Sequence, residues 1–211
     1  MKTTVWILAL PVIVLALGLS AASRAGDEDG PYSRGGVQAK IQYCKDCHGS
    51  AGQGYHGYLT MPRLAGQTPE YIELQLRAFA ERTRERGLFI NMARGHGVSP
   101  SMRAALAAHF HSLNPAPLDS GPGSVSLGKT IYEDGLPEAN VPACAACHGP
   151  DAKGEGVIPR LAGQLYSYTV SELANWSQKR KNESAAIMEP IAHGLTKSQI
   201  AAVSAYLSRL R

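Results

Sequence analysis

The chain has 211 residues, a length that fits either one domain or two. Its composition is that of an ordinary soluble protein, 44% hydrophobic and 18% charged, and its 22 glycines and 13 prolines indicate many turns. The formal net charge of +4 would fall to +2 if residues 1–25, which carry Lys2 and Arg24, were removed. Neither value indicates a nucleic acid or an anionic membrane as a partner.

Residues 1–25 have the pattern of a secretory signal peptide. Lys2 supplies the positive start, residues 5–19 form an apolar run, and Ser23-Arg24-Ala25 resembles a small-x-small cleavage site. The run contains Pro11 and has 15 residues, so it is short for a membrane-spanning helix of about 20. A retained membrane anchor is the alternative. With either one, the functional part of the chain is expected outside the cytoplasm.

A Cys-x-x-Cys-His-Gly motif occurs at residues 44–49, after a short helix expected at 37–43, and again at residues 144–149. Cys-x-x-Cys-His is the attachment signature of a c-type haem, with two thioether cysteines and a histidine that binds the iron. A redox dithiol pair, two disulfides or a zinc site built from both pairs would leave the two histidines unexplained. The motifs therefore predict two haems, which would also supply apolar bulk to a chain with only 7% aromatic residues. The expected attachment residues are Cys44, Cys47, Cys144 and Cys147, and the expected proximal iron ligands are His48 and His148.

An internal repeat follows each motif. The hexamer Pro-Arg-Leu-Ala-Gly-Gln occupies residues 62–67 and again 159–164, an offset of 97 (159 − 62), whereas the cysteines are offset by 100 (144 − 44). The first half therefore has three extra residues (100 − 97), within residues 53–61. Six identical residues at a fixed offset indicate a duplication.

Each hexamer is expected to open a helix. Thr68 and Pro69 form an N-cap and an N1 proline, and Ile72, Leu76 and Phe79 then share one face. The counterpart, from Tyr166 to about residue 181, presents Tyr166, Val170, Leu173 and Trp176. Both helices finish in basic tracts, at residues 82–86 and 179–181, which we interpret as solvated helix ends in preference to a docking patch for a partner.

A second amphipathic helix closes each half. Ser99 and Pro100 begin one, with Leu106, Phe110 and Leu113 facing inward, and a capping box at Thr196 and Gln199 begins the other, followed by Ile200, Val203, Leu207 and Leu210. Residues 114–126 are rich in Pro, Gly and Ser and read as a linker. No stretch alternates like a strand. The prediction is an all-α protein with domains at 26–113 and 127–211.

The sixth iron ligand determines whether a haem carries electrons or catalyses a reaction. A fixed ligand closes the iron to substrate, whereas an open position lets small molecules bind. Methionine is expected for a carrier, because its soft sulfur favours ferrous iron. Met188, 40 residues beyond His148, is the methionine that follows the second motif. For the first haem we select Met92, 44 residues beyond His48, over Met61 and Met102, whose counterparts are Ile158 and Gln199. At offset 97, however, Asn91 rather than Met92 aligns with Met188.

Histidine is the rival sixth ligand. His96 and His193 match at offset 97, and each precedes a glycine, so coordination of both haems by two histidines is an alternative. His109 and His111 are expected at the surface of a terminal helix. A proximal histidine also needs an acceptor for its second ring nitrogen, which a carbonyl at or near Pro62 and Pro159 could supply. A rigid turn explains the two prolines equally well.

The paired motifs, the repeated hexamer, the methionine before each last helix and the leader resemble the dihaem cytochrome c4 family, over about residues 36–211. The resemblance implies two class I cytochrome c domains related by a pseudo-twofold axis, each wrapped around one haem. It implies ligation of the haems by His48 and Met92 and by His148 and Met188.

The function implied is that of a non-catalytic periplasmic electron carrier, soluble or attached to the outer face of the inner membrane. Its partners would be a quinol-oxidising complex and a terminal oxidase. The alternatives are a cytochrome subunit that accepts electrons from a sulfide- or alcohol-oxidising enzyme and, with an open iron, a haem enzyme.

Overall fold

The computed structural model describes residues 34–84, 98–118, 120–179 and 186–211. The leader (1–25) and the segment that holds Met92 and His96 lie outside the described residues. The helices of the first half are α1 (Arg34–His48), α2 (Pro69–Glu81) and α3 (Pro100–His111). The second half has α4 (Val125–Asp134), a 3₁₀ turn η1 (Pro137–Ala139), α5 (Ala145–His148), α6 (Tyr166–Ala174), α7 (Trp176–Lys179), α9 (Met188–His193) and α10 (Lys197–Leu207).

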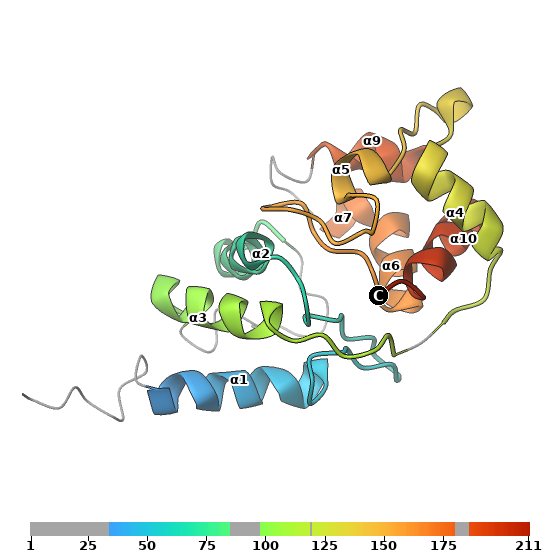
Figure 1. Ribbon diagram of the computed structural model, residues 1–211. Coiled ribbons are helices and arrows are strands. Elements are labelled where there is room, and N and C mark those ends of the chain that lie inside the picture. The colour runs from blue at the N-terminus through green and yellow to red at the C-terminus, as the bar shows by residue number, and fades with distance from the viewer. Residues whose placement is uncertain (1–33, 85–97, 119, 180–185) are drawn as a thin grey trace, which may run out of the picture.

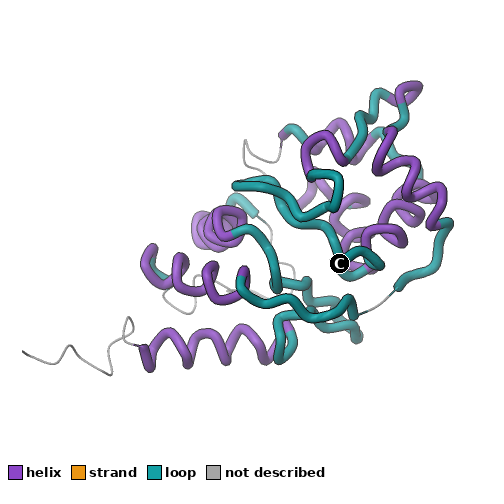
Figure 2. Tube along the Cα trace, in the orientation of Figure 1, coloured by secondary structure: helices purple, strands orange, loops and turns teal. Residues whose placement is uncertain are grey.

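The all-α prediction is confirmed. Within the described residues the only extended pairings are three isolated bridges, and the tube in Figure 2 consists of helices and loops there. Among the same residues, no helix is both long and apolar enough to cross a membrane.

The helices form two groups (Figure 1). Helices α1, α2 and α3 gather on one side, and α4 to α10 on the other, joined by the segment after α3. In the first group, α3 packs against both α1 and α2. Its core consists of Ile41, Ile72, Val98, Met102, Leu106, Ala107 and Phe110.

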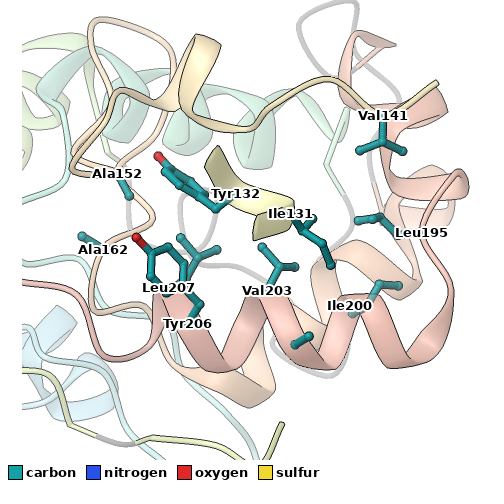
Figure 3. Packing of buried hydrophobic residues seen from close by; sticks show 11 residues of the cluster. Ile131, Tyr132, Val141, Ala152, Ala162, Leu195, Ile200, Val203, Tyr206 and Leu207 are labelled. Atoms are coloured by element: carbon teal, nitrogen blue, oxygen red, sulfur yellow. The ribbon is translucent and has the colours of Figure 1, made fainter. Parts of the chain in front are cut away.

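The second group has its own core, shown in Figure 3. Helix α10 packs most extensively against α4 and then against α6. Ile131 and Tyr132 of α4 are fully buried against Val203 and Leu207 of α10. Each half therefore packs its last helix against an early helix, α3 against α1 and α10 against α4.

Helix ends follow the local chemistry of the sequence. Thr196 and Gln199 form the expected capping box at the start of α10, and the Ser99 side chain accepts the backbone N–H of Met102 at the start of α3. Helix α4 begins at Val125, with Ser124 as its N-cap, within the expected linker.

The prediction of one long helix from Tyr166 to about residue 181 is wrong in one respect. The helix breaks at Asn175, which separates α6 from α7, and the Asn175 side-chain amide donates to the carbonyl of Ser171 at 3.0 Å. Asparagine side chains compete in this way for backbone groups, which makes them poor in helix interiors.

Candidate haem sites

The first Cys-x-x-Cys-His motif forms the last turn and a half of α1, and a loop folds back beneath it. Gly49 follows the motif with φ of +86°, a conformation that favours glycine, and its equivalent Gly149 has φ of +80°. The backbone N–H of Gly54 then donates to the carbonyl of His48 at 2.8 Å. The chain thus reverses directly after the histidine and returns past it.

The second motif is built in the same way, on the short helix α5. Gly154 N–H donates to the carbonyl of His148 at 3.0 Å. The two loops differ only farther on, where the bridge Tyr55–Met61 encloses residues 56–60 and the bridge Glu155–Ile158 encloses 156–157. The difference, five residues minus two, is the predicted insertion of three.

Each proximal histidine has a hydrogen-bond acceptor for its second ring nitrogen, as the repeated prolines suggested. His48 Nδ1 lies 2.8 Å from the carbonyl of Pro62, and His148 Nδ1 lies 2.9 Å from that of Pro159. A carbonyl is only an acceptor, so each Nδ1 carries the proton and each Nε2 is free to bind a metal. This confirms the carbonyl interpretation of the repeated proline.

Burial prepares both rings for iron. The rings of His48 and His148 are buried, and this lowers the pKa of each histidine, although the hydrogen bonds to Pro62 and Pro159 act in the opposite direction. A neutral imidazole with a fixed tautomer is the form that ligates a metal. The donor set therefore fits a haem iron in each half.

The four cysteines are free thiols at the haem motifs. Cys44 and Cys144 are half-buried, and burial raises the pKa of each to about 11, whereas Cys47 and Cys147 are exposed. No group of three or more His, Cys, Asp or Glu side chains in the described part of the chain is placed to hold a metal ion. Both pairs are therefore available for thioether bonds.

The second motif has an additional anchor. The Tyr132 hydroxyl, from α4, donates to the carbonyl of Gly149 at 2.5 Å, directly after the motif. Because Tyr132 is fully buried in the core, this contact ties the haem-binding turn to the packing of α4 against α10.

The candidate sixth ligands have different environments. Met188 is half-buried and begins α9, which packs against α6 and α7. Met102 and Met61 are buried, and Met102 belongs to the core of the first half. His193 is exposed, and its Nε2 lies 2.9 Å from the Ser177 hydroxyl. His111 is exposed as expected, whereas His109 is half-buried, and the choice between Met92 and His96 lies outside the described residues.

The repeated hexamers form the contact between the two halves. The side-chain amide of Gln164 accepts the backbone N–H of Arg63 at 2.8 Å and donates to its carbonyl at 3.1 Å. Gln67 makes the same pair of bonds to the backbone of Arg160, at 2.7 and 3.0 Å. The duplicated residues therefore bind each other reciprocally, as expected for a pseudo-twofold arrangement. Sequence reasoning missed this role, although identity of all six residues in both copies was its signal.

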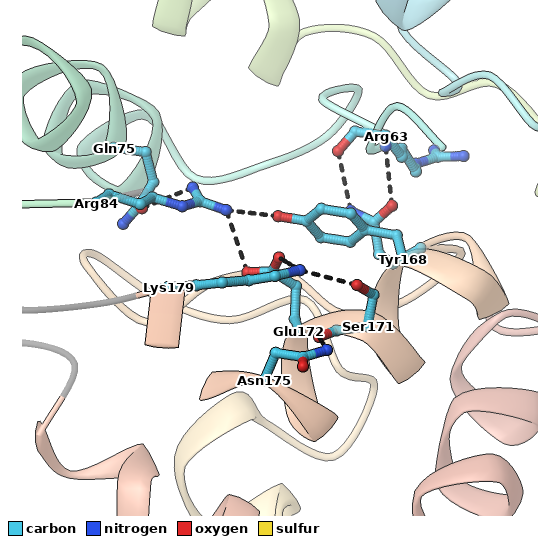
Figure 4. Close-up of polar contacts among 9 residues, drawn as sticks. Arg63, Gln75, Arg84, Tyr168, Ser171, Glu172, Asn175 and Lys179 are labelled. Carbon is cyan, nitrogen blue, oxygen red and sulfur yellow. Dashed lines mark hydrogen bonds and ion pairs between the residues drawn. The ribbon is translucent and has the colours of Figure 1, made fainter. Parts of the chain in front are cut away.

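The interpretation of the basic tracts as solvated helix ends is wrong for Arg84 and Lys179. Arg84 is buried, donates to Gln75, and reaches across to the Tyr168 hydroxyl at 2.7 Å and to Glu172 at 3.2 Å (Figure 4). Lys179 bonds the other carboxylate oxygen of Glu172, also at 3.2 Å. The helix following each hexamer faces the other half of the molecule, so the ends of these helices meet carboxylate and hydroxyl groups instead of water alone.

Comparison with known proteins agrees with this geometry. A family model described as cytochrome c matches residues 125–211. A cytochrome c4 of Thiocapsa roseopersicina is 36% identical over 197 residues, which cover 90% of this chain and 96% of that protein. This chain belongs to the dihaem cytochrome c4 family.

Two further relatives match most of the chain. The solved structure of reduced recombinant cytochrome c4 from Pseudomonas stutzeri matches with a TM-score of 0.74 and 25% identity, over 84% of this chain and 98% of that one. A thiosulfate dehydrogenase electron acceptor of Stutzerimonas stutzeri is 32% identical over 216 residues, covering 100% of this chain and 97% of that protein. As a member of the family, this chain is a dihaem electron carrier with two covalently bound haem c groups and acts with redox protein partners.

Proposed function

We propose that this cytochrome c4-type protein is a non-catalytic shuttle that passes single electrons between two larger redox complexes, a quinol-oxidising complex and a terminal oxidase. The observation that carries the proposal is the repetition of one rigid proximal site. In both halves a buried histidine is bonded to the carbonyl of the hexamer proline, at 2.8 and 2.9 Å. The iron supplies the one-electron chemistry, and the chain holds the geometry of its ligand constant.

The residues have defined roles in this proposal. Cys44 and Cys47 attach the first haem and Cys144 and Cys147 the second, through their thiol sulfurs. His48 and His148 ligate through Nε2, with Nδ1 held by the backbone. Met92 and Met188 would supply the sulfur ligands that complete each iron site, which would keep oxygen and small anions from binding there. A closed, low-spin iron changes its surroundings little on reduction, which suits electron transfer and not catalysis.

The arrangement of the halves supports transfer within the chain. The proposed domains, 26–113 and 127–211, are joined by the linker 114–126. The hexamers that supply Pro62 and Pro159 also supply the reciprocal glutamine contacts. The two proximal sites are therefore tied to the same interface, and both stay in fixed register.

We further propose that the protein works in the periplasm, dissolved or attached to the outer face of the inner membrane. The signal-like residues 1–25 support export. Fractionation of cells that produce the full chain would test this: the haem protein should appear in the periplasmic or the membrane fraction, and recovery in the cytoplasm would contradict it.

A second candidate function is that of an electron acceptor for one catalytic partner. The relative in Stutzerimonas stutzeri named as a thiosulfate dehydrogenase electron acceptor supports it. A freestanding shuttle should purify alone. Copurification with a catalytic subunit at a fixed stoichiometry would favour the second function.

Absorption and EPR spectra of the purified holoprotein during a redox titration test the assignment of ligands. We expect two low-spin ferric haems with the long-wavelength band of methionine sulfur ligation. Met188→Ala should remove that band from one haem and Met92→Ala from the other. A high-spin haem in the unmodified protein would instead indicate an open iron and a haem enzyme, and retention of the band in Met92→Ala would exclude Met92.

A further inference from the structure

A pocket lies between the two halves, beside the hexamers and next to the contact of Gln67 with the Arg160 backbone already described. Its volume is about 250 Å³. Thr68 and His111 line it from the first half, Asn114 from the start of the linker, and Lys153 and Arg160 from the second half. The polar side chains that line it all carry hydrogen-bond donors, and those of Lys153 and Arg160 are cations, so an anion complements its polar part.

Two buried donors of this pocket lack partners. Arg160 and Thr68 are each 7% exposed, and Arg160 Nη2 and Thr68 Oγ1 have no hydrogen-bond partner among the described residues. Thr68 is the N-cap of α2, yet its hydroxyl does not cap the helix. Buried polar groups are nearly always satisfied in native structures, and an unpaired one destabilises the fold by about 1–3 kcal/mol. Two such groups in one pocket point to a missing acceptor.

The equivalent arginine of the first half shows what a satisfied guanidinium looks like. Arg63 donates its Nε–H to Ala65, as Arg160 does to Ala162. Beyond that bond the two differ, because Arg63 also donates to the linker carbonyls of Pro115, at 2.9 Å, and Ala116, at 3.4 Å. The counterpart of Thr68 is Leu165, which is fully buried. Among the described residues, the unsatisfied donors thus occur at one of the two pseudo-equivalent positions of the interface, where Arg160 meets Thr68, and not where Arg63 meets Leu165.

The charge of Arg160 and the direction of α2 both favour an anion in the pocket. Desolvation by burial lowers the pKa of Arg160, and the charge of Asp151 offsets this only in part, so a further bound negative charge would stabilise the guanidinium. The N-terminus of α2 begins at Thr68, where the helix dipole also favours an anion. Asp151 pairs with Lys153 at 2.8 Å, but both side chains are more than half exposed, and such surface pairs are weak competitors.

We propose that this pocket binds one small tetrahedral oxyanion of the phosphate–sulfate class, held by Arg160 and Lys153 of the second half and by Thr68 of the first. Such an anion offers only acceptors, which matches the donors present, and carries the charge that a water molecule lacks. Since its contacts come from both halves, binding favours the docked arrangement of the two haem domains.

Calorimetric titration of the oxidised holoprotein with inorganic phosphate, at ionic strength kept constant with chloride, tests the proposal. We expect one saturable site per chain and a Tm that rises with phosphate. Arg160→Gln should weaken binding by more than about tenfold, because a charge-assisted hydrogen bond is lost. Thr68→Val keeps the shape and should weaken binding about threefold to tenfold. This second variant keeps the test decisive if Arg160→Gln does not fold.

Lys129→Gln is the control, because it removes the same charge from an exposed pair on α4 outside the pocket. It should leave phosphate affinity within about twofold, as expected for an independent site. Absence of saturable binding, or equal losses in Lys129→Gln and Arg160→Gln, would overturn the proposal. A shift in the reduction potential of one haem in Arg160→Gln without any phosphate binding would also overturn it, by assigning the donors to a haem carboxylate.

Discussion

Arg84 and Glu172 form a buried ion pair across the interface between the halves, with Nη2 and Oε2 3.2 Å apart. Each comes from the helix that follows a hexamer or from its end, and they are 88 positions apart in the chain. At offset 97, the residue that corresponds to Glu172 is Gln75, which bonds the same guanidinium at 2.7 Å. The interface is therefore symmetric in shape and asymmetric in charge.

Glu172→Gln should destabilise the protein, because Arg84 and Lys179 would lose their shared carboxylate while Arg84 stays buried. We expect a loss of about 1–3 kcal/mol in the free energy of unfolding, measured with denaturant and followed by far-UV circular dichroism. Glu133→Gln removes the carboxylate of the exposed pair Lys129–Glu133 on α4 and should cost less than about 1 kcal/mol. Equal losses in the two variants would show that the buried pair stabilises the protein no more than the exposed pair does.

Gln164→Leu should loosen the contact between the halves. It removes both hydrogen bonds to the Arg63 backbone and an internal bond to Leu165 N–H, leaving buried backbone groups unpaired. The expected loss is roughly 1–3 kcal/mol for an unsatisfied buried group, with a wider distribution of iron–iron distances by pulsed EPR. Gln42→Ala, at an exposed amide within α1, is the control and should change stability by less than about 0.5 kcal/mol. An unchanged distance distribution in Gln164→Leu would mean that the glutamines do not set the register.

Met102→Ala separates a packing methionine from a ligand. Met102 is 3% exposed within the core formed by α1, α2 and α3, so its truncation should cost about 2–5 kcal/mol of stability. The methionine-sulfur absorption band should persist at both haems in the folded fraction, measured at low temperature. Disappearance of the band from one haem would make Met102 the ligand and displace Met92.

Tyr132→Phe should affect the second haem alone. Its hydroxyl donates to the Gly149 carbonyl directly after the second motif. The same carbonyl also accepts the backbone N–H of Ala152 at 3.2 Å, so the substitution removes one of two hydrogen bonds, at a cost of about 0.5–1.5 kcal/mol. We expect a changed reduction potential for one haem and an unchanged potential for the other in a redox titration. Tyr206→Phe is the comparison and should change neither potential. The ring centroids of Tyr206 and Tyr132 are 5.6 Å apart. Equal shifts of both potentials in Tyr132→Phe would contradict a local role.

Much of the site could be predicted from the sequence, because its chemistry is local. Three features each act within one turn or one loop. They are the haem motifs, the capping box at Thr196 and Gln199, and the proline whose carbonyl accepts the hydrogen bond from the proximal histidine. Their geometry follows from spacing, backbone preferences and hydrogen-bonding valence, which a single sequence carries. The duplication also predicted that both halves would repeat the same construction.

Only the tertiary structure decided what the halves do to each other. The exchange of hydrogen bonds between Gln67 and Arg160 and between Gln164 and Arg63 joins residues 93 and 101 positions apart. No spacing rule specifies such pairs, since they depend on how two folded surfaces dock. The same docking buried Arg84, which the sequence placed at a solvated helix end. It also brought Arg160 and Thr68, whose Nη2 and Oγ1 lack hydrogen-bond partners among the described residues, to one pocket.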